Sequence, residues 1–347
     1  MAILSLETKQ DELVTSLRRE HLLQSFIGNH PAFTTLVERL RTIAAKKIAV
    51  LLIGETGTGK GRCAEFIHQY GDRHHHAFIT YNCGAGPESL FEDQLFGHAR
   101  GAFTNADKER AGLIEESHRG ILFLDEINSL NPSAQVKLNH FLETGCFRRI
   151  GETQLRYSDV RIIAAANSDL KKEAHGGRFR QDLYYRLAEY ELYLPPLRAR
   201  REDIIPLANY FLAKNAHLGR DDKAQFSEET LQSLLEYDWP GNVRELENFI
   251  KRAIIESQEG ALDKPPLFPV SSGIKSNEPD ALQGLTWKNA KKRVVASFEK
   301  QYLENLLQRY HGKVTTCARH AGMHSPDFWK LLRKYHIDAH HFLPKQS

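Results

Sequence analysis

A glycine-rich stretch that ends in a lysine is the part of this chain best suited to chemistry. It reads Gly54-Glu55-Thr56-Gly57-Thr58-Gly59-Lys60 and lies between an apolar run, 48–53, and a helical pattern that begins near Arg62. Glycines let successive backbone N–H groups point at phosphate oxygens, and the N-terminus of the next helix adds partial positive charge. Lys60 supplies a full charge for terminal phosphates. This order of elements favours a nucleotide-phosphate loop over an ordinary glycine turn.

Two acidic residues supply the carboxylates that the active site of a nucleotide hydrolase requires. Asp125 and Glu126 close the apolar run 120–124, where Asp125 suits a Mg²⁺ ligand and Glu126 suits a base that polarises water. Gly61 stands where such loops usually carry a hydroxyl for Mg²⁺, so Asp125 and ordered waters would carry more of the metal. Asn167 ends a neighbouring strand and could reach the γ-phosphate or the water. Acidic helix capping for the pair, and an ordinary turn residue at Asn167, are the alternatives.

Three further segments have residue types that chemistry could use. Arg180 and Arg186 bracket an apolar run and could complete a neighbour's active site, although basic clusters are usually solvated faces. The small-residue segment 101–106 carries Phe103 at its centre, which suggests a contact made in one nucleotide state; a plain surface loop is the alternative. The tract 74–76 is three consecutive histidines, and we expect a solvated loop there and not a metal site.

These residues need a parallel sheet to position them. Continuous apolar strands alternate with helical patterns, which indicates an α/β fold whose sheet is covered on both faces. Polar residues follow the carboxyl ends of the strands, where such sheets bind ligands. The expected strands are 48–53, 78–81, 120–124, 160–166 and 190–194.

The second half of the chain is helical. Residues 204–256 form three helical patterns, and the stretch after residue 260 is rich in Pro, Ser and Gly, as linkers are. A long apolar stripe at 290–310 comes next. A short helix, a turn at Gly322 and a final helix with Ser325 as its N-cap and Pro326 in its first turn follow it, which is the pattern of a helix-turn-helix.

The bulk composition excludes several classes. The chain has 347 residues, 41% of them hydrophobic and 26% charged, and a net charge of +3, so any nucleic-acid contact requires a local basic patch. Its four cysteines are scattered and read as free thiols. We find neither a membrane-spanning run nor a signal peptide, and we expect a cytoplasmic protein that does not bind membranes.

Six motifs together identify a family. The chain resembles the bacterial enhancer-binding proteins, which are sigma-54-dependent transcriptional activators of the AAA+ class. The resemblance covers 26–256 and the C-terminal helices, and it implies an AAA+ P-loop α/β fold with a helical lid and a Fis-like helix-turn-helix domain. The motifs that carry it are the phosphate loop 54–60, Glu92-Asp93-Gln94-Leu95-Phe96-Gly97-His98, 101–106, 122–126, 179–187 and Trp239-Pro240-Gly241-Asn242-Val243-Arg244-Glu245-Leu246.

The resemblance implies a role for each motif residue. Nucleotide binding falls to Gly54, Glu55, Thr56, Gly57, Thr58, Gly59, Lys60, Gly61 and Arg244, the last being the sensor II arginine. Catalysis falls to Asp125, Glu126, Asn82, Asn167, Arg180 and Arg186. In this set Asp125 holds the metal, Asn82 restrains Glu126, Asn167 is sensor I, and the arginines are fingers that reach a neighbour. Sigma-54 contact falls to Phe103, Thr104 and Asn105, with 147–158 as a second pore loop.

Three single positions and the start of the last helix depart from the family pattern. Asn105 replaces the second glycine of the sigma-contact loop, Gly61 replaces a usual glutamate, and Ala166 replaces a threonine. The last helix usually opens with basic residues, and here it opens with 325–327. The DNA contacts that remain are Arg319, Ser325, Lys330, Arg333 and Lys334.

By the same resemblance the domains are 1–24, a short N-terminal segment; 25–198, the ATPase α/β subdomain; 199–260, the lid; 261–285, the linker; and 286–347, the DNA-binding domain. The cofactors are ATP and Mg²⁺. The partners are sigma-54 RNA polymerase, promoter-upstream DNA and copies of the chain itself in a hexameric ring, assembled directly or from dimers. No receiver domain precedes the ATPase region, so we expect control by a regulatory protein acting in trans or by expression level.

The function implied is activation of sigma-54 promoters by ATP-driven remodelling of the closed RNA polymerase complex into an open one. Asn105 keeps open a second reading, a sigma-54-independent AAA+ regulator that binds DNA. A non-hydrolysing nucleotide-dependent scaffold is a third, and the intact set of Lys60, Glu126 and the two arginines argues against it.

Overall fold

The chain forms two compact units, 1–265 and 266–347. The computed structural model describes residues 19–20, 22–86, 88–104, 106–218, 225–256, 261–262, 296, 299–300, 302–303, 306–307, 310, 312–335 and 337–339. Four expectations lie wholly or mostly outside these residues. They concern the N-terminal segment 1–24, the position Asn105, the linker 261–285 and the helix expected over 290–310.

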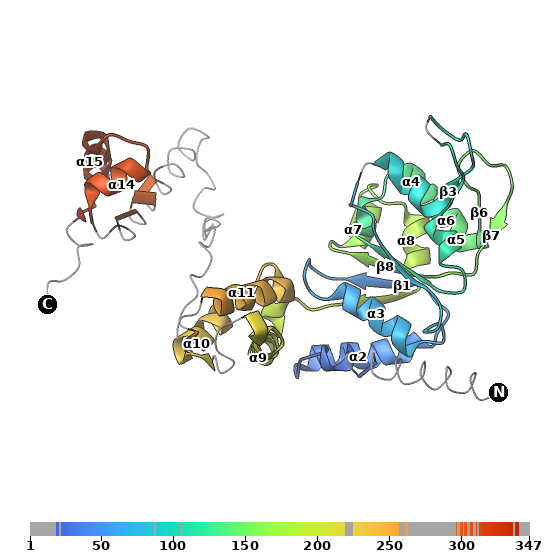
Figure 1. The fold of residues 1–347 in the computed structure, drawn as a ribbon, viewed down its shortest axis with the longest axis horizontal. Helices are drawn as coiled ribbons and strands as arrows, with labels where there is room; N and C mark the ends of the chain where they lie inside the picture. The colour runs from blue at the N-terminus through green and yellow to red at the C-terminus, as the bar shows by residue number, and fades with distance from the viewer. Residues whose placement is uncertain are drawn as a thin grey trace. The chain divides into compact units, whose positions relative to one another are not determined.

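A five-stranded parallel sheet forms the centre of the first unit (Figure 1). Its strand order is β2-β5-β8-β1-β9, and every neighbouring pair runs parallel. The strands are β1 (Val50–Ile53), β2 (Phe78–Asn82), β5 (Ile121–Asp125), β8 (Arg161–Ala166) and β9 (Tyr190–Tyr193). The five expected strands and their parallel arrangement are therefore confirmed.

Alternation along the strands creates two hydrophobic cores, one on each face of the sheet. In β1, Leu51 and Ile53 join one core, whereas Val50 and Leu52 join the other. The second core is completed by α2 (Pro31–Ala44) and α3 (Lys60–Tyr70). On the other face lie α4 (Glu88–Phe96), α5 (Leu113–Glu116), α6 (Pro132–Thr144), α7 (Leu170–His175) and α8 (Gln181–Leu187).

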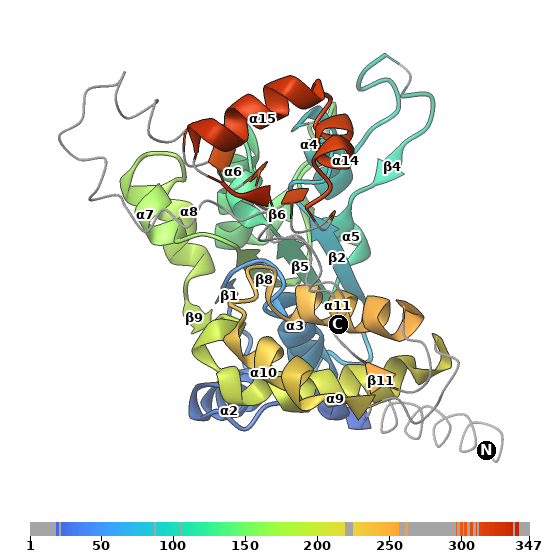
Figure 2. The ribbon, with the colours of Figure 1, turned by 90° about the vertical axis from the view of Figure 1, so that its left-hand side faces the viewer.

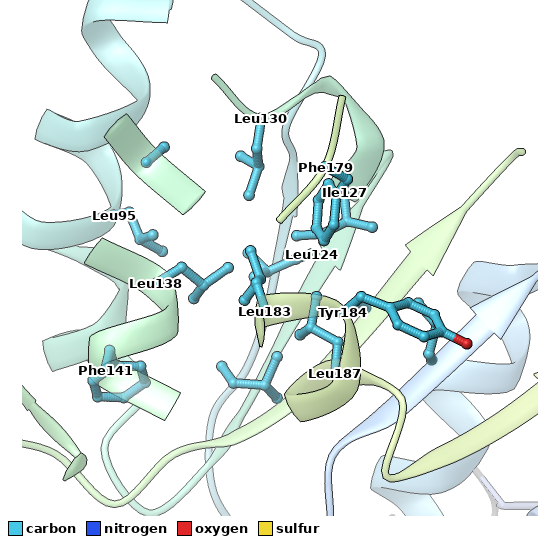
Figure 3. Close-up of a cluster of buried hydrophobic side chains, with 14 of the residues drawn as sticks. Leu95, Leu124, Ile127, Leu130, Leu138, Phe141, Phe179, Leu183, Tyr184 and Leu187 are labelled. Atoms are coloured by element: carbon cyan, nitrogen blue, oxygen red, sulfur yellow. The ribbon is translucent and has the colours of Figure 1, made fainter. Parts of the chain in front are cut away.

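Helices α6 and α8 pack tightly in this first core. Figure 3 shows Leu138 of α6 and Leu183 and Leu187 of α8 gathered around Leu124 of β5. All four side chains are fully buried, which stabilises the fold by roughly 1.5–3 kcal/mol for each leucine relative to an exposed one. The start of α6 is fixed by Asn131, whose side-chain oxygen accepts a hydrogen bond from Ala134 N.

Two short hairpins extend from the end of the sheet. Strands β3 (Gly97–His98) and β4 (Arg110–Ala111) pair antiparallel and close the loop 99–109, and β6 (Cys146–Phe147) and β7 (Arg156–Tyr157) close the loop 148–155. The sequence predicts loops at these places and gives no sign of the strands. An isolated bridge joins His98 to Ile150, so the two hairpins lie side by side.

The lid follows the sheet. It packs α9 (Ile204–Asn215), α10 (Glu228–Glu236) and α11 (Asn242–Glu256) around the buried Trp239 (Figure 1, Figure 2). The short elements of this unit are η1 (Ile127–Ser129), η2 (Leu197–Ala199), η3 (Arg201–Asp203) and η4 (Ala216–Leu218), with the strand pair β10 (Gln225–Phe226) and β11 (Ala261–Leu262). The pair places β11 at the start of the stretch expected to be linker.

The second unit contains α14 (Val314–His320) and α15 (Ser325–Lys334), joined through Gly322 at φ +66°. The N-cap of α15 is His324 and not the expected Ser325, which is the first helical residue. Phe328 and Leu332 of α15 are buried against α14. Within the described ranges of both units, no helix is both long and apolar enough to cross a membrane.

Candidate active site

The phosphate loop connects β1 directly to α3. Gly57 and Gly59 adopt positive φ values of +81° and +103°, a backbone conformation that residues with a side chain rarely adopt. Gly59 is the N-cap of α3 and has no side chain to satisfy the first N–H groups of the helix. Those donors remain directed at the loop, which is the arrangement that binds phosphate.

Lys60 is the first residue of α3, and only 8% of it is exposed. Its ammonium donates to Gly54 O at 2.6 Å and to Glu55 O at 3.1 Å, so the side chain folds back across the loop. Burial lowers the pKa of Lys60, and the charges of Asp125 and Glu126 oppose that shift. The geometry places a desolvated cation between the loop and two carboxylates.

Asp125 and Glu126 lie where β5 ends. Asp125 Oδ1 accepts a hydrogen bond from Glu126 N at 3.0 Å. Glu126 has φ +54° and ψ +45°, a left-handed backbone that costs free energy in a non-glycine residue and is found mostly where function requires it. A Cβ at Gly84 would lie 2.6 Å from Glu126 Oε2 and 3.3 Å from Asn82 Oδ1, so glycine gives both side chains room beside the turn.

A cavity of about 440 Å³ brings together most of the expected nucleotide residues; Gly54, Glu55 and Thr58 do not line it. It lies between the phosphate loop, the carboxyl edge of the sheet and the lid. Its lining includes Thr56, Gly57, Gly59, Lys60, Gly61, Asp125, Glu126, Asn167 and Arg244, together with Tyr210, Phe211 and Lys214 of α9. A smaller apolar pocket of about 70 Å³ adjoins it, lined by Phe26, Ile27 and Leu36 among others. The arrangement suits a phosphate chain in the larger cavity and a flat apolar group in the smaller pocket.

The lid is attached to the phosphate loop by direct bonds that the sequence analysis missed. Glu55 accepts hydrogen bonds from both terminal nitrogens of Arg198, at 2.5 and 2.7 Å, and these bonds are the main reason that its pKa is lowered. Val243 N donates to Gly57 O at 3.1 Å. The side chain of Asn242 is fully buried; it accepts a hydrogen bond from Leu197 N and donates one to Thr56 O of the phosphate loop.

The two arginines expected to act as fingers lie outside this cavity. Arg180 is the N-cap residue of α8 and pairs with Asp182 at 2.8 Å, and Arg186 pairs with Glu143 at 2.9 Å. The backbone of Arg180 is held by Gln135, a buried residue that the sequence analysis did not single out. Neither arginine lines the cavity of its own chain.

The expected sigma-contact loop lies between β3 and β4. Phe103 is 46% exposed and Thr104 is exposed, whereas Asn105 lies outside the described residues. Main-chain bonds tie this loop to the second one, from Ile150 N to Gly97 O and from Ala99 N to Ile150 O. The buried Arg149 of the second loop pairs with Glu109 and Glu115. The two loops therefore share one base.

The expected DNA contacts lie on the second unit. Arg319 lies in the last turn of α14, and Ser325, Lys330, Arg333 and Lys334 belong to α15. Arg319 and Arg333 are exposed, whereas Lys330 pairs with Asp327 at 3.0 Å and Lys334 pairs with Glu299 at 2.9 Å. Positive side chains thus lie along the exposed part of α15.

Comparison with known proteins agrees with this geometry. A model of the Sigma-54 interaction domain matches residues 26–193, and a model of the AAA+ ATPase lid domain matches residues 198–283. The transcriptional activator RocR of Bacillus subtilis is 39% identical over 319 residues, which are 91% of this chain and 69% of RocR. The transcriptional regulatory protein GlrR of Escherichia coli is 38% identical over 323 residues, 93% of this chain and 70% of GlrR.

A solved structure has the same fold. NtrX from Brucella abortus in complex with ADP matches with a TM-score of 0.66 and 28% identity, over 97% of this chain and 75% of NtrX. NtrX has also been solved in complex with ATP, and that structure matches with a TM-score of 0.64. With the sigma-54 interaction domain, the lid and relatives similar over most of their length, the chain belongs to the sigma-54-dependent transcriptional activators and is an AAA+ ATPase.

Proposed function

We propose that this chain is a DNA-binding activator that hydrolyses ATP in a ring of its own copies and thereby converts the closed sigma-54 RNA polymerase complex into an open one. The observation that carries the proposal is the cavity in which Lys60, Asp125, Glu126 and Arg244 meet. The proposed domain bounds are those given by the sequence, with the ATPase subdomain at 25–198 and the DNA-binding domain at 286–347.

In the proposed mechanism the phosphate loop binds the phosphates and Lys60 neutralises their charge. Glu126 takes a proton from the attacking water, and Asn167 orients that water or the γ-phosphate. Mg²⁺ prefers oxygen ligands, and the Asp125 carboxylate faces the cavity with only one oxygen bonded to backbone, so the site fits this ion. When bound, Mg²⁺ would neutralise phosphate charge; Gly61 adds no ligand.

A neighbouring copy of the chain supplies the arginines that neutralise the remaining negative charge of the transition state. Arg180 directly precedes α8 and Arg186 lies in its last turn, away from the cavity of their own chain, and a head-to-tail ring places such a surface against the next active site. Assembly would exchange their pairs with Asp182 and Glu143 for phosphate contacts. A hexamer is the ring that the family resemblance favours.

Coupling to sigma-54 is assigned to the loop 99–109. Asn82 and Glu126 approach each other at Gly84, and the chain runs from there through α4 to the loop. A change at Glu126 on loss of the γ-phosphate would therefore be transmitted to Phe103 and Thr104. In the second unit, the exposed basic residues of α15 are proposed to contact DNA upstream of the promoter.

Two variants test the ATP site. Lys60→Ala should abolish nucleotide binding, and Glu126→Gln should bind ATP without turning it over. Equilibrium binding of a fluorescent ATP analogue and a phosphate-release assay measure the two effects. Normal nucleotide affinity in Lys60→Ala, or retained turnover in Glu126→Gln, would remove these residues from the proposed mechanism.

A further inference from the structure

Asn242 occupies a position that a different residue could not fill equally well. Its backbone has φ +52°, in the left-handed region that asparagine tolerates better than most residues with a side chain. The residue is fully buried. Its side-chain oxygen accepts a hydrogen bond from Leu197 N at 2.8 Å, and its side-chain nitrogen donates to Thr56 O at 3.0 Å. Longer contacts reach Glu55 Oε2 at 3.3 Å and Pro240 O at 3.4 Å.

These bonds join three segments that are distant in sequence. Thr56 belongs to the phosphate loop, Leu197 begins the connection between sheet and lid, and Asn242 itself begins α11. The backbones also meet, because a Cβ on Gly57 would lie only 2.1 Å from Gly241 O. The phosphate loop and the first turn of α11 thus form one rigid junction.

The junction determines where Arg244 lies. Arg244 is two residues beyond Asn242 in the first turn of α11, and it lines the nucleotide cavity. Rotation of that turn relative to the phosphate loop would move the guanidinium with respect to bound phosphates. Displacements near 1 Å at a charged contact are enough to weaken it substantially.

We propose that Asn242 is a positioning residue for ATP hydrolysis, which holds Arg244 in register with the phosphate loop and so favours ATP over ADP. The inference rests on the proposed function and takes Arg244, which lines the nucleotide cavity, to contact the γ-phosphate of ATP. An amide is required because one neighbour, Leu197 N, is a donor and the other, Thr56 O, is an acceptor. A carboxylate at this position would accept the hydrogen bond from Leu197 N, but it would repel both Thr56 O and the Glu55 carboxylate.

Two substitutions at Asn242 distinguish the contribution of its backbone conformation from that of its side-chain hydrogen bonds. Asn242→Gly keeps the left-handed backbone and removes every side-chain bond. Asn242→Asp keeps the bond from Leu197 N but replaces the donor with a negative charge. Asn215→Asp is the matched control, since Asn215 is a buried lid asparagine that donates to Phe211 O within α9.

The experiment measures the affinities of a non-hydrolysable ATP analogue and of ADP for the full chain, together with kcat and KM. Asn242→Asp should lower the preference for the analogue over ADP about tenfold, Asn242→Gly should lower it less, and Asn215→Asp should leave it unchanged. Combining Asn242→Asp with Arg244→Ala should add little to the loss in either single variant, because the two residues act as one unit.

Three results would overturn the inference. One is a wild-type nucleotide preference in Asn242→Asp when Arg244→Ala is impaired. Another is an equal loss of analogue and ADP affinity, which would assign Asn242 to the loop alone. If Arg244→Ala itself keeps normal nucleotide preference, the proposed role of Arg244 and the inference both fail. The proposed ATP site is judged independently, by the variants at Lys60 and Glu126. A single cooperative thermal transition and saturable ADP binding establish that each variant is folded.

Discussion

The ring of His98 lies against the ring of Phe103, with the two centroids 4.9 Å apart and the planes at 65°. His98 is buried at the base of the loop 99–109, where Nδ1 lies 2.5 Å from Asp93 Oδ1 and Nε2 lies 2.9 Å from Lys108 O. A carboxylate and a carbonyl both accept hydrogen bonds, so each ring nitrogen of His98 faces an acceptor. The exposed Phe103 is therefore supported by a side chain that is fixed at both ends.

Replacing His98 with leucine should loosen this support without disturbing the nucleotide cavity. His98→Leu keeps apolar bulk, loses both hydrogen bonds and removes the close partner of Asp93, whose contact with Arg110 is longer, at 3.9 Å. We expect ATP turnover within about twofold of wild type and sigma-54 affinity lowered about tenfold. His175→Leu is the control, because His175 also bonds to a backbone carbonyl but is exposed on α7. Equal sigma-54 affinity in the two variants would contradict the role given to His98.

Arg186→Ala should lose ATP turnover because the missing guanidinium belongs to the neighbour's site. Subunits with Lys60→Ala have a defective phosphate loop but an intact Arg186. Mixing equal amounts of the two variants should restore turnover to up to about a quarter of wild type, since that share of interfaces pairs a working loop with a working arginine. Steady-state phosphate release measures the recovery. If the mixture is as inactive as the separate variants, the shared-site arrangement is wrong.

Asn131→Ala should destabilise the ATPase unit by about 1 kcal/mol, because the Asn131 side chain caps α6 through Ala134 N at 2.8 Å. Asn139→Ala is the comparison within the same helix. Asn139 lies in the helix interior, where alanine is the better helix former, so stability should be equal or slightly higher. Urea unfolding followed by far-ultraviolet circular dichroism gives both midpoints. A capping role is excluded if the two variants have the same midpoint.

His68 should make the protein sensitive to acid. It is buried, stacks on Phe78 at 5.0 Å and hydrogen-bonds to His76 O at 3.0 Å. Burial lowers the pKa of His68 below its ordinary value of 6.5, so the unfolded chain takes up this proton at a higher pH than the folded chain does. The contribution of His68 to stability is therefore complete above pH 6.5 and is lost as the pH falls through the folded pKa.

The measurement compares wild type with His68→Gln, which cannot titrate. Between pH 7.5 and pH 5.5 the free energy of unfolding should fall more in wild type than in the variant, and the other histidines are common to both proteins. Parallel curves for the two proteins would show that His68 does not titrate in this range.

The sequence predicted the central sheet well because each strand is a continuous apolar run, and burial on both faces requires that pattern. Leu51 and Leu52 belong to opposite cores, and both had to be apolar. The hairpins were not predicted, because β3 and β4 have two residues each and no alternation can be read over that length. Their pairing depends on close backbone contact at Gly97, where a Cβ would lie 2.3 Å from Arg110 O.

The chemical residues of the cavity follow local rules, since Lys60 and Asp125 are each marked by a neighbouring strand. The contact between the phosphate loop and the lid could not be predicted from local rules, because Asn242 and Glu55 are 187 residues apart in the sequence. Arg198 is one of several arginines close together in the sequence, where its bond to Glu55 could not be distinguished from a solvated charge. Similarly, Asp93 and His98 were identified within a motif, and only the structure places His98 beneath Phe103.

The most direct test of the central claim is the binding of the full chain to purified sigma-54 in the presence of ADP alone and of ADP with a metal fluoride that mimics the transferring γ-phosphate. A complex that forms only with the mimic, and is lost in Phe103→Ala, is the predicted result. No complex under either condition, with normal ATP turnover and DNA binding, would contradict the account and favour a sigma-54-independent regulator.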